Sequence, residues 1–209
     1  MTGTVEHDLR LPLSEADVRA LRVGDIVYVS GEIHSTAGIP THVRMLECLE
    51  RGEALPFDLR NGALFHLGSY NIEDANGDLQ ILYMNPTTST RFNDLMPKLI
   101  PALGLRATGG KGGLDARSAQ AMKEAGCVYL SFLGGGAPIL TDAVKRVTGI
   151  GWRDMISHYR LVRIEVERLG PLTVAIDAHG NSVYDDTIKA MQEKRASILA
   201  ELRADRERS

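Results

Sequence analysis

The sequence predicts an α/β fold in which helices flank a mixed sheet. β-branched runs typical of strands, such as residues 26–30, alternate with segments whose apolar residues recur at helical spacing, such as residues 41–51. The two kinds of segment do not follow a strict βαβα order, so a purely parallel sheet is not expected. With 209 residues and no low-complexity linker, the chain is expected to form one domain spanning residues 1–209.

The first half of the chain is expected to begin with a short helix. Ser14 and Asp17 have the spacing of a capping box and precede the apolar residues Val18 and Leu21. Asn76-Gly77 is a typical turn between two strands. The elements expected in this half after the first helix are a strand at residues 26–30, a helix at 41–51, and strands at 63–67 and 79–83 joined by that turn.

In the second half, a helix holding Leu95 to Ile100 is expected after Pro86. Pro97 would kink it, because an interior proline removes a backbone hydrogen bond. In the last helix the charged residues after Glu193 are interpreted as a solvated face, opposite an apolar stripe of Ile188, Met191, Ile198 and Leu202. The other expected elements are a helix at 115–125, a strand at 127–133, a helix at 138–147, strands at 159–166 and 172–176, and this long charged helix.

Composition narrows the classes of function. The formal net charge of −3 gives no reason to expect a nucleic-acid partner, and no apolar run approaches the roughly 20 residues that span a bilayer. The first eight residues lack the basic and apolar regions of a signal peptide, so a cytoplasmic location is expected. Cys48 and Cys127 are interpreted as buried hydrophobic residues. Two cysteines cannot supply the usual thiolates of an iron–sulfur cluster or a structural zinc site.

The clearest sign of a binding site is a pair of segments that carry hydroxyls and fixed cations. An Asn-Pro-Thr-Thr-Ser-Thr-Arg segment ends at Arg91, and a Gly-Gly-Lys-Gly-Gly segment is centred on Lys111. The two cations, with the hydroxyls of Thr87 and Thr88, suit a small anion and above all a carboxylate. From spacing alone, a helix N-cap at the threonines and a flexible surface loop around the lysine remain alternatives.

The glycine-rich segments do not fit nucleotide motifs. A Walker A loop ending at Lys111 requires a glycine at position 105, which is Leu105. The Gly134–Gly136 run fails GxGxxG because position 139 is Ile139.

Six histidines are scattered without an HxxxH or HxH pair, so no metal site is expected on this chain. His34, just after a strand, and His42, at the start of a helix, are candidates to face a site, with a structural role as the alternative for each. His66 lies within an apolar strand and is expected to be a core or edge histidine.

Several segments occur in the order seen in one family of enzymes. They are residues 21–27 with 30–33, 54–59, 85–91, 97–99, 111–112, 128–130 with 134–137, and 176–177 with 180–181. In this order the chain resembles the β subunit, or C-terminal domain, of class I fumarases and L(+)-tartrate dehydratases, which are iron–sulfur hydro-lyases. The resemblance covers almost the whole chain.

The resemblance implies a single swivelling β/β/α domain that closes over a separate, cysteine-bearing α subunit. That α subunit, and not this chain, would hold a 4Fe–4S cluster, in an α2β2 heterotetramer. The reaction implied is the reversible hydration or dehydration of a small hydroxy (di)carboxylic acid of the fumarate, malate or tartrate type.

The resemblance also implies roles for individual residues. Thr87 would transfer a proton or position a hydroxyl, and Thr88 would contact the substrate. Arg91 and Lys111 would hold a carboxylate. His34 and His42 would line the site.

One segment departs from the family pattern. The family pattern is Thr-Ala-Arg-Asp followed by two small residues and a histidine, whereas this chain has Gly38 and Ile39 in place of the Arg-Asp pair and keeps His42. In the family that arginine helps to hold a substrate carboxylate. An acid with one carboxylate replaced by an apolar or neutral group is therefore expected to suit this chain. The alternative function is a non-catalytic module that binds a small anion or regulates, on the same fold.

Overall fold

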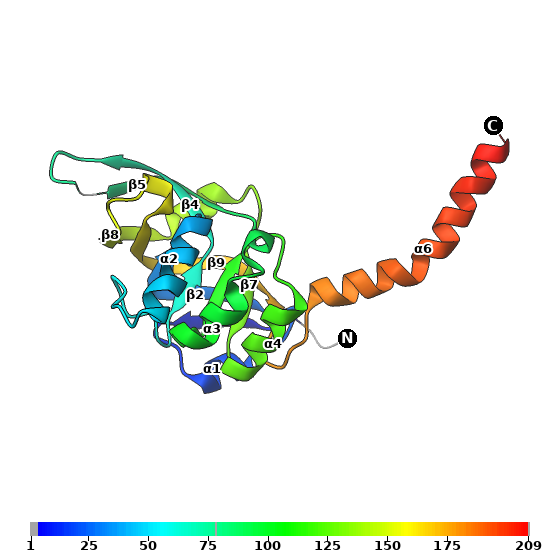
Figure 1. Ribbon diagram of the computed structural model, residues 1–209, viewed down its shortest axis with the longest axis horizontal. Coiled ribbons are helices and arrows are strands. Elements are labelled where there is room, and N and C mark those ends of the chain that lie inside the picture. The colour runs from blue at the N-terminus through cyan, green and yellow to red at the C-terminus, as the bar shows by residue number, and fades with distance from the viewer. Residues whose placement is uncertain (1–3, 78, 209) are drawn as a thin grey trace.

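The computed structural model describes residues 4–77 and 79–208 and shows helices packed against a mixed sheet (Figure 1). The expected fold class is confirmed. No helix within these residues has both the length and the apolar character needed to cross a bilayer.

Across the described residues, seven strands form one sheet in the order β1-β2-β3-β6-β7-β9-β8. Five strands run parallel to one another, namely β1, β2, β3, β6 and β7, whereas β9 is antiparallel to β2, β7 and β8. Because β9 pairs with both β2 and β7, the strands β2, β3, β6, β7 and β9 close into a ring. The bounds are β1 (Glu6–Arg10), β2 (Ile26–Ser35), β3 (Ala63–Phe65), β6 (Ala107–Gly110), β7 (Val128–Ser131), β8 (Val144–Gly151) and β9 (Leu161–Ile176).

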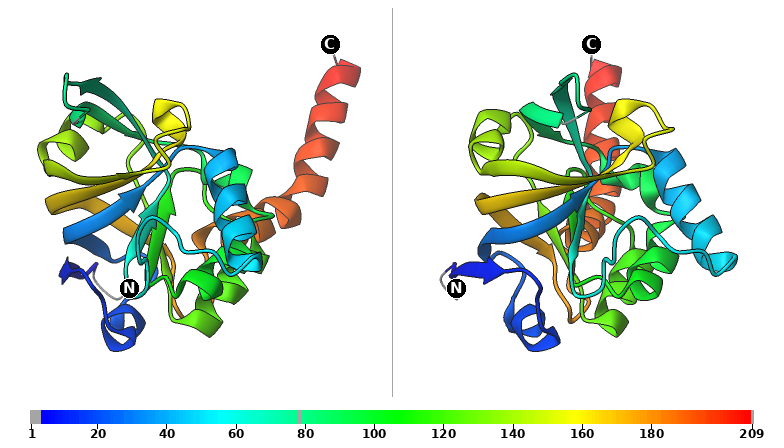
Figure 2. Two further views of the ribbon diagram at one scale, coloured as in Figure 1. Left: turned by 60° about the vertical axis from the view of Figure 1, so that its left-hand side comes forward. Right: turned by 90° about the vertical axis from the view of Figure 1, so that its left-hand side faces the viewer.

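A separate antiparallel hairpin and several helices complete the fold. The hairpin consists of β4 (Leu67–Glu73) and β5 (Leu79–Pro86). Figure 2 shows the hairpin on one side of the sheet, with α2, α3 and α4 along the other. The helices are α1 (Glu15–Ala20), α2 (Ile39–Glu50), α3 (Met96–Leu103), α4 (Ala116–Ala125), α5 (Ala137–Asp142) and α6 (Val183–Arg208), with 3-10 turns η1 (Ser89–Phe92) and η2 (Ser157–Tyr159).

The strands bury side chains on both faces, which produces two apolar clusters. Phe65 and Leu130 lie in one cluster, together with the hairpin residue Met84. Leu64 and Tyr129, which alternate with them along β3 and β7, lie in the other cluster with residues of α2, α3 and α4. This two-sided burial explains why the strands read as continuous apolar runs rather than as alternating patterns.

Local signals predicted several elements correctly. The capping box is confirmed, since the Asp17 amide donates to Ser14 Oγ over 3.1 Å and the Ser14 amide donates to Asp17 Oδ2 over 2.9 Å. The predicted helix at 115–125 is α4, which ends at Gly126 in the left-handed conformation. The charged final helix is α6.

Other predictions were wrong in their bounds. The helix predicted around Pro97 begins at Met96, so this proline sits in the first turn, where it has no hydrogen bond to break, and the interior proline of the helix is Pro101. The helix predicted at 138–147 ends at Asp142, and the following residues with Val144 and Val147 form β8.

Further corrections concern the strands. The hairpin partner of β5 is β4, because β3 ends at Phe65 and belongs to the main sheet. The two strands predicted at 159–166 and 172–176 are one strand, β9, which continues through Arg168 at φ 49. β1 and β6 were not predicted.

Candidate active site

Four neighbouring parallel strands end at the same edge of the sheet. Their last residues are Ser35 of β2, Phe65 of β3, Gly110 of β6 and Ser131 of β7. Ligand sites in α/β sheets commonly lie beyond the carboxyl ends of such strands. The segments that continue from this edge carry four residues singled out in the sequence, namely Gly38, His66, Lys111 and Gly134.

Backbone hydrogen bonds join the threonine segment to the lysine segment. The Lys111 amide donates to the Thr87 carbonyl over 3.0 Å, and the Ser89 amide donates to the Lys111 carbonyl over 2.8 Å. Thr88 and Lys111 form an isolated parallel bridge. The Thr87 amide in turn donates to the His66 carbonyl over 2.8 Å. Two motifs that lie far apart in the sequence are therefore held as adjacent strands.

The side chain of Arg91 folds back over the threonines. Its Nη2 donates to Thr87 Oγ1, and its Nε donates to the Thr88 carbonyl over 3.3 Å. The guanidinium carbon lies 5.7 Å from the ring centroid of Phe92, on the same 3-10 turn. Arg91 is exposed, and Thr87 and Lys111 are half-buried. The structure thus brings together the four residues Thr87, Thr88, Arg91 and Lys111, with both cations accessible to a ligand.

Two alternative interpretations were open for these segments, namely a helix N-cap at the threonines and a flexible surface loop around the lysine. Thr88 is at the N-cap position of η1, but its side chain makes no capping hydrogen bond. Gly109 and Gly110 are buried residues of β6, whereas Gly112, just after Lys111, is an exposed bend. A methyl group on Gly110 would lie 2.4 Å from Ser89 Oγ and 2.9 Å from the Thr87 carbonyl oxygen. Glycine is therefore required for the close approach of the two segments.

Buried polar side chains form hydrogen bonds with Ser89 of the threonine segment. The Tyr129 hydroxyl donates to Ser89 Oγ over 2.8 Å, and the same Oγ lies 2.8 Å from His66 Nδ1. His66 is fully buried, which confirms the expectation of a core histidine. Its contact with Ser89 was not predicted, because the three residues come from separate segments and share no local pattern.

His42 and His66 both pack on Phe92. The ring centroids lie 4.2 Å from Phe92 for His42 and 4.4 Å for His66, and 5.2 Å from each other. Burial lowers the pKa of His42 to about 4, partly opposed by the Gly38 carbonyl 2.7 Å from its Nδ1. Burial, with the charge of Arg91 and that of His42 when it is protonated, holds the pKa of His66 well below its usual range. Both rings are therefore neutral at neutral pH, behind the turn that carries Arg91.

His34 has different neighbours. Its ring centroid lies 5.6 Å from that of Phe57, and burial lowers its pKa. The charged groups that act on it are Arg163, Glu32 and Asp58. None of these residues belongs to the segments around Thr87 and Lys111, so the structure does not bring His34 together with them.

Tyr159 occupies the space beside Gly38. A methyl group on Gly38 would lie 2.5 Å from Tyr159 Cδ1 and 2.9 Å from Thr41 Oγ1. Thr41 Oγ1 also donates to the Tyr159 carbonyl. Ile39 is 42% exposed. No larger side chain fits at position 38 while Tyr159 stays in place, a relationship that the sequence did not predict.

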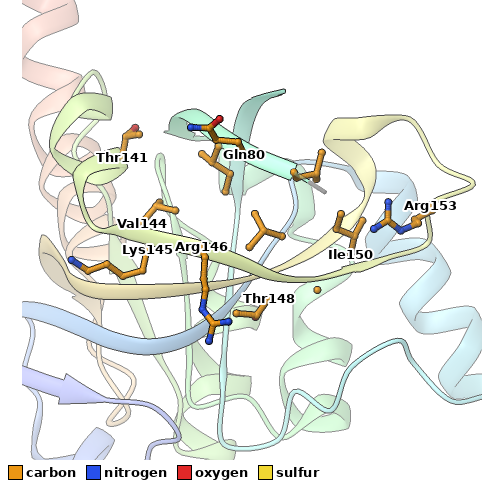
Figure 3. Close-up of a pocket in the computed structure, with 12 residues that line it drawn as sticks. Gln80, Thr141, Val144, Lys145, Arg146, Thr148, Ile150 and Arg153 are labelled. Carbon is orange, nitrogen blue, oxygen red and sulfur yellow. The ribbon is translucent and has the colours of Figure 1, made fainter. Parts of the chain in front are cut away.

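A cavity lies elsewhere, between β5 and β8 (Figure 3). It measures about 680 Å³ and includes the cations Lys145, Arg146 and Arg153, but none of the predicted site residues. Each cation is paired with a carboxylate, over 2.8 Å, 2.6 Å and 3.6 Å respectively. The cavity therefore does not share the open cationic character of the Arg91–Lys111 region.

The two cysteines lie in the interior, as expected. Cys48 and Cys127 are both buried and free. Burial raises the pKa of the Cys127 thiol to about 12, so it stays protonated. Within residues 4–77 and 79–208, no three His, Cys, Asp or Glu side chains gather in a way that could hold a metal ion.

Comparison with known sequences decides the family. Residues 2–187 match the family described as Fumarase C-terminus. The chain belongs to this family. The resemblance drawn from the ordered segments of the sequence is therefore confirmed.

Relatives of this fumarase C-terminus chain carry two kinds of name. A protein of Methanocaldococcus jannaschii, provisionally named L(+)-tartrate dehydratase subunit beta, is 38% identical over 90% of this chain and 95% of its own length. The L(+)-tartrate dehydratase subunit beta of Escherichia coli strain K12 is 29% identical over 93% and 94%. A Geobacillus stearothermophilus protein, provisionally named fumarate hydratase class I, is 31% identical over 89% of this chain but only 35% of its own length.

Proposed function

We propose that this chain is the β subunit of a two-component iron–sulfur hydro-lyase that reversibly hydrates a small unsaturated carboxylic acid. One observation carries the proposal: the backbone pairing of Lys111 with Thr87 and Ser89, which places two accessible cations beside two adjacent hydroxyls. The names of the relatives, tartrate dehydratase and fumarate hydratase, support a hydro-lyase of this kind.

The side chains suit distinct tasks in such a reaction. Arg91 and Lys111 would hold a substrate carboxylate through charge-assisted hydrogen bonds. Thr87 would position or transfer the proton that is exchanged next to that carboxylate. A free hydroxyl is a weak base, but the guanidinium of Arg91 donates to Thr87 Oγ1 and so stabilises negative charge there. Thr88, whose backbone forms the bridge to Lys111, would contact the substrate through its side chain.

The proposal places the 4Fe–4S cluster on a cysteine-bearing α subunit. This chain has two cysteines, and Cys127 is kept as a buried thiol. The "subunit beta" names of the relatives support a partner chain. When bound, the cluster supplies a Lewis acid for the hydroxyl that is added or removed. We further propose an α2β2 assembly in the cytoplasm.

The other end of the substrate is proposed to be apolar or neutral. Tyr159 fills the space beside Gly38, so position 38 offers no cation for a second carboxylate. His42, one helical turn further on, is neutral as well. The preferred substrate would then carry one carboxylate at Arg91 and Lys111 and an uncharged group near Tyr159.

The test is anaerobic reconstitution. The chain is co-expressed with a candidate cysteine-bearing α subunit, and the purified complex is assayed with fumarate, tartrate and unsaturated monocarboxylic acids. Hydration that requires both chains is the expected result. A complex that binds carboxylates but hydrates none of them would favour the alternative, a non-catalytic module that binds small anions.

A further inference from the structure

The final helix, α6, carries an unpartnered apolar stripe. It runs from Val183 to Arg208, contains no buried residue and projects away from the rest of the structure (Figure 1). Only its start is anchored, where Val183 and Tyr184 pack against the core. The stripe consists of five large side chains that are 41–58% exposed, namely Ile188, Met191, Ile198, Leu199 and Leu202.

The spacing of this stripe is that of a coiled-coil seam. Ile188, Met191, Ile198 and Leu202 fall at a and d positions of a heptad, with Arg195 at the a position between them. The match to the fumarase C-terminus family ends at residue 187. The stripe therefore lies beyond the segment that defines the family.

We propose that α6 pairs in antiparallel fashion with α6 of a second copy of this chain. The charges of the helix favour this partner and this direction. Its first turn carries Asp185 and Asp186, whereas its last turn carries Arg206 and Arg208 together with Asp205 and Glu207. Antiparallel pairing brings Asp185 of each copy beside Arg206 of the other.

One register aligns the middle of the seam with its flanks, and at each end it sets Ile188 opposite Asp205 of the second copy. With a positions facing d positions, Met191 faces Leu202 of the second copy, and the aliphatic stem of Arg195 covers Ile198 of the second copy. In the same register Lys194, at a g position, lies beside Glu201 of the second copy. Symmetry repeats each contact, so the dimer contains two Lys194–Glu201 ion pairs.

The parallel arrangement is less favourable. It would place Arg195 opposite Arg195 of the second copy and Asp205 opposite its own equivalent, which sets like charges together at the seam. Glu201 would then lie beside Arg206 of the second copy rather than beside Lys194. The two arrangements therefore respond differently to exchange of the charges at 194 and 201.

The experiment measures self-association of the full-length chain by sedimentation equilibrium. The wild type is expected to form dimers at micromolar concentrations. Lys194→Glu and Glu201→Lys should each weaken the dimer by about tenfold or more, because each creates two like-charge contacts. The double variant K194E/E201K should recover the wild-type affinity. Lys189→Glu and Glu193→Lys make the same charge changes at outward positions and should leave it unchanged.

Three outcomes overturn the proposal. The chain is monomeric throughout the micromolar range, both single exchanges leave the dimer intact, or the double variant fails to recover. Leu202→Lys provides a check independent of charge, since it should abolish the dimer while leaving thermal unfolding unchanged, as no residue of α6 is buried. The measurement needs no activity, so its result is separate from that of the proposed function.

Discussion

Lys111 donates its backbone amide to the carbonyl oxygen of Thr87 over 3.0 Å. This bond extends β6 by one residue and pairs it with the segment that leaves β5. The position of the lysine relative to the threonines is therefore set by backbone geometry and not by flexible side chains. The bond fixes the backbone positions from which the Lys111 and Thr87 side chains extend toward the same region.

The close approach at Gly110 predicts a sensitive glycine. Gly110→Ala would place a methyl group 2.4 Å from Ser89 Oγ, so the threonine segment must move away from β6. We expect a loss of about 1–3 kcal/mol in the free energy of unfolding, measured by urea denaturation. Gly134→Ala is the matched control, because its methyl group would meet only Lys111 Cδ at 3.8 Å. Equal stability of the two variants would contradict the account of this site.

The contact between Gly38 and Tyr159 predicts a specific coupling. Gly38→Ala should destabilise the chain by about 1–3 kcal/mol, since the backbone at φ −103 accepts alanine but the methyl group would lie 2.5 Å from the Tyr159 ring, its shortest contact, and 2.9 Å from Thr41 Oγ1. In a Tyr159→Ala background the same substitution should cost much less. A double-mutant cycle by chemical denaturation measures this coupling. Additive effects would show that Tyr159 does not limit position 38.

The buried His42 predicts lower stability in acid. Its pKa is about 4 in the folded state and about 6.5 when unfolded, so the unfolded chain binds this proton first as the pH falls. The stabilisation contributed by the neutral His42 ring is complete above pH 6.5 and declines toward pH 4. Between pH 7 and pH 5 the free energy of unfolding therefore falls by about 2 kcal/mol.

The measurement is urea denaturation at both pH values. His42→Phe should lose this part of the pH dependence, whereas Met45→Leu, on the same helix and without a titratable group, should keep it. An unchanged pH dependence in the His42 variant would contradict the burial of a neutral ring.

Local patterns predicted what local interactions decide. The capping box of α1 and the glycine that ends α4 are each formed within a few residues, and both were predicted from spacing. β6 was missed because Ala107–Gly110 is short and rich in glycine, and its stability comes from pairing with β3 and β7.

The same distinction applies to the candidate site. Thr87, Thr88, Arg91 and Lys111 were predicted together from their chemistry and from the family resemblance, and the structure places them side by side. The packing of Tyr159 against Gly38 and the contact of Tyr129 with Ser89 join distant segments. No spacing in the sequence encodes them.

The central claim is that the Thr87–Arg91 turn and Lys111 form this chain's half of an active site. The most direct test is kcat/KM for acid hydration by the reconstituted complex carrying Arg91→Ala, compared with Arg60→Ala, which removes another exposed arginine. Loss of a charged hydrogen bond of about 1.5–3 kcal/mol predicts a fall of roughly 10- to 150-fold for Arg91→Ala, with unchanged α-subunit binding and no fall for Arg60→Ala. Equal kcat/KM values for both variants and the wild type would contradict the claim.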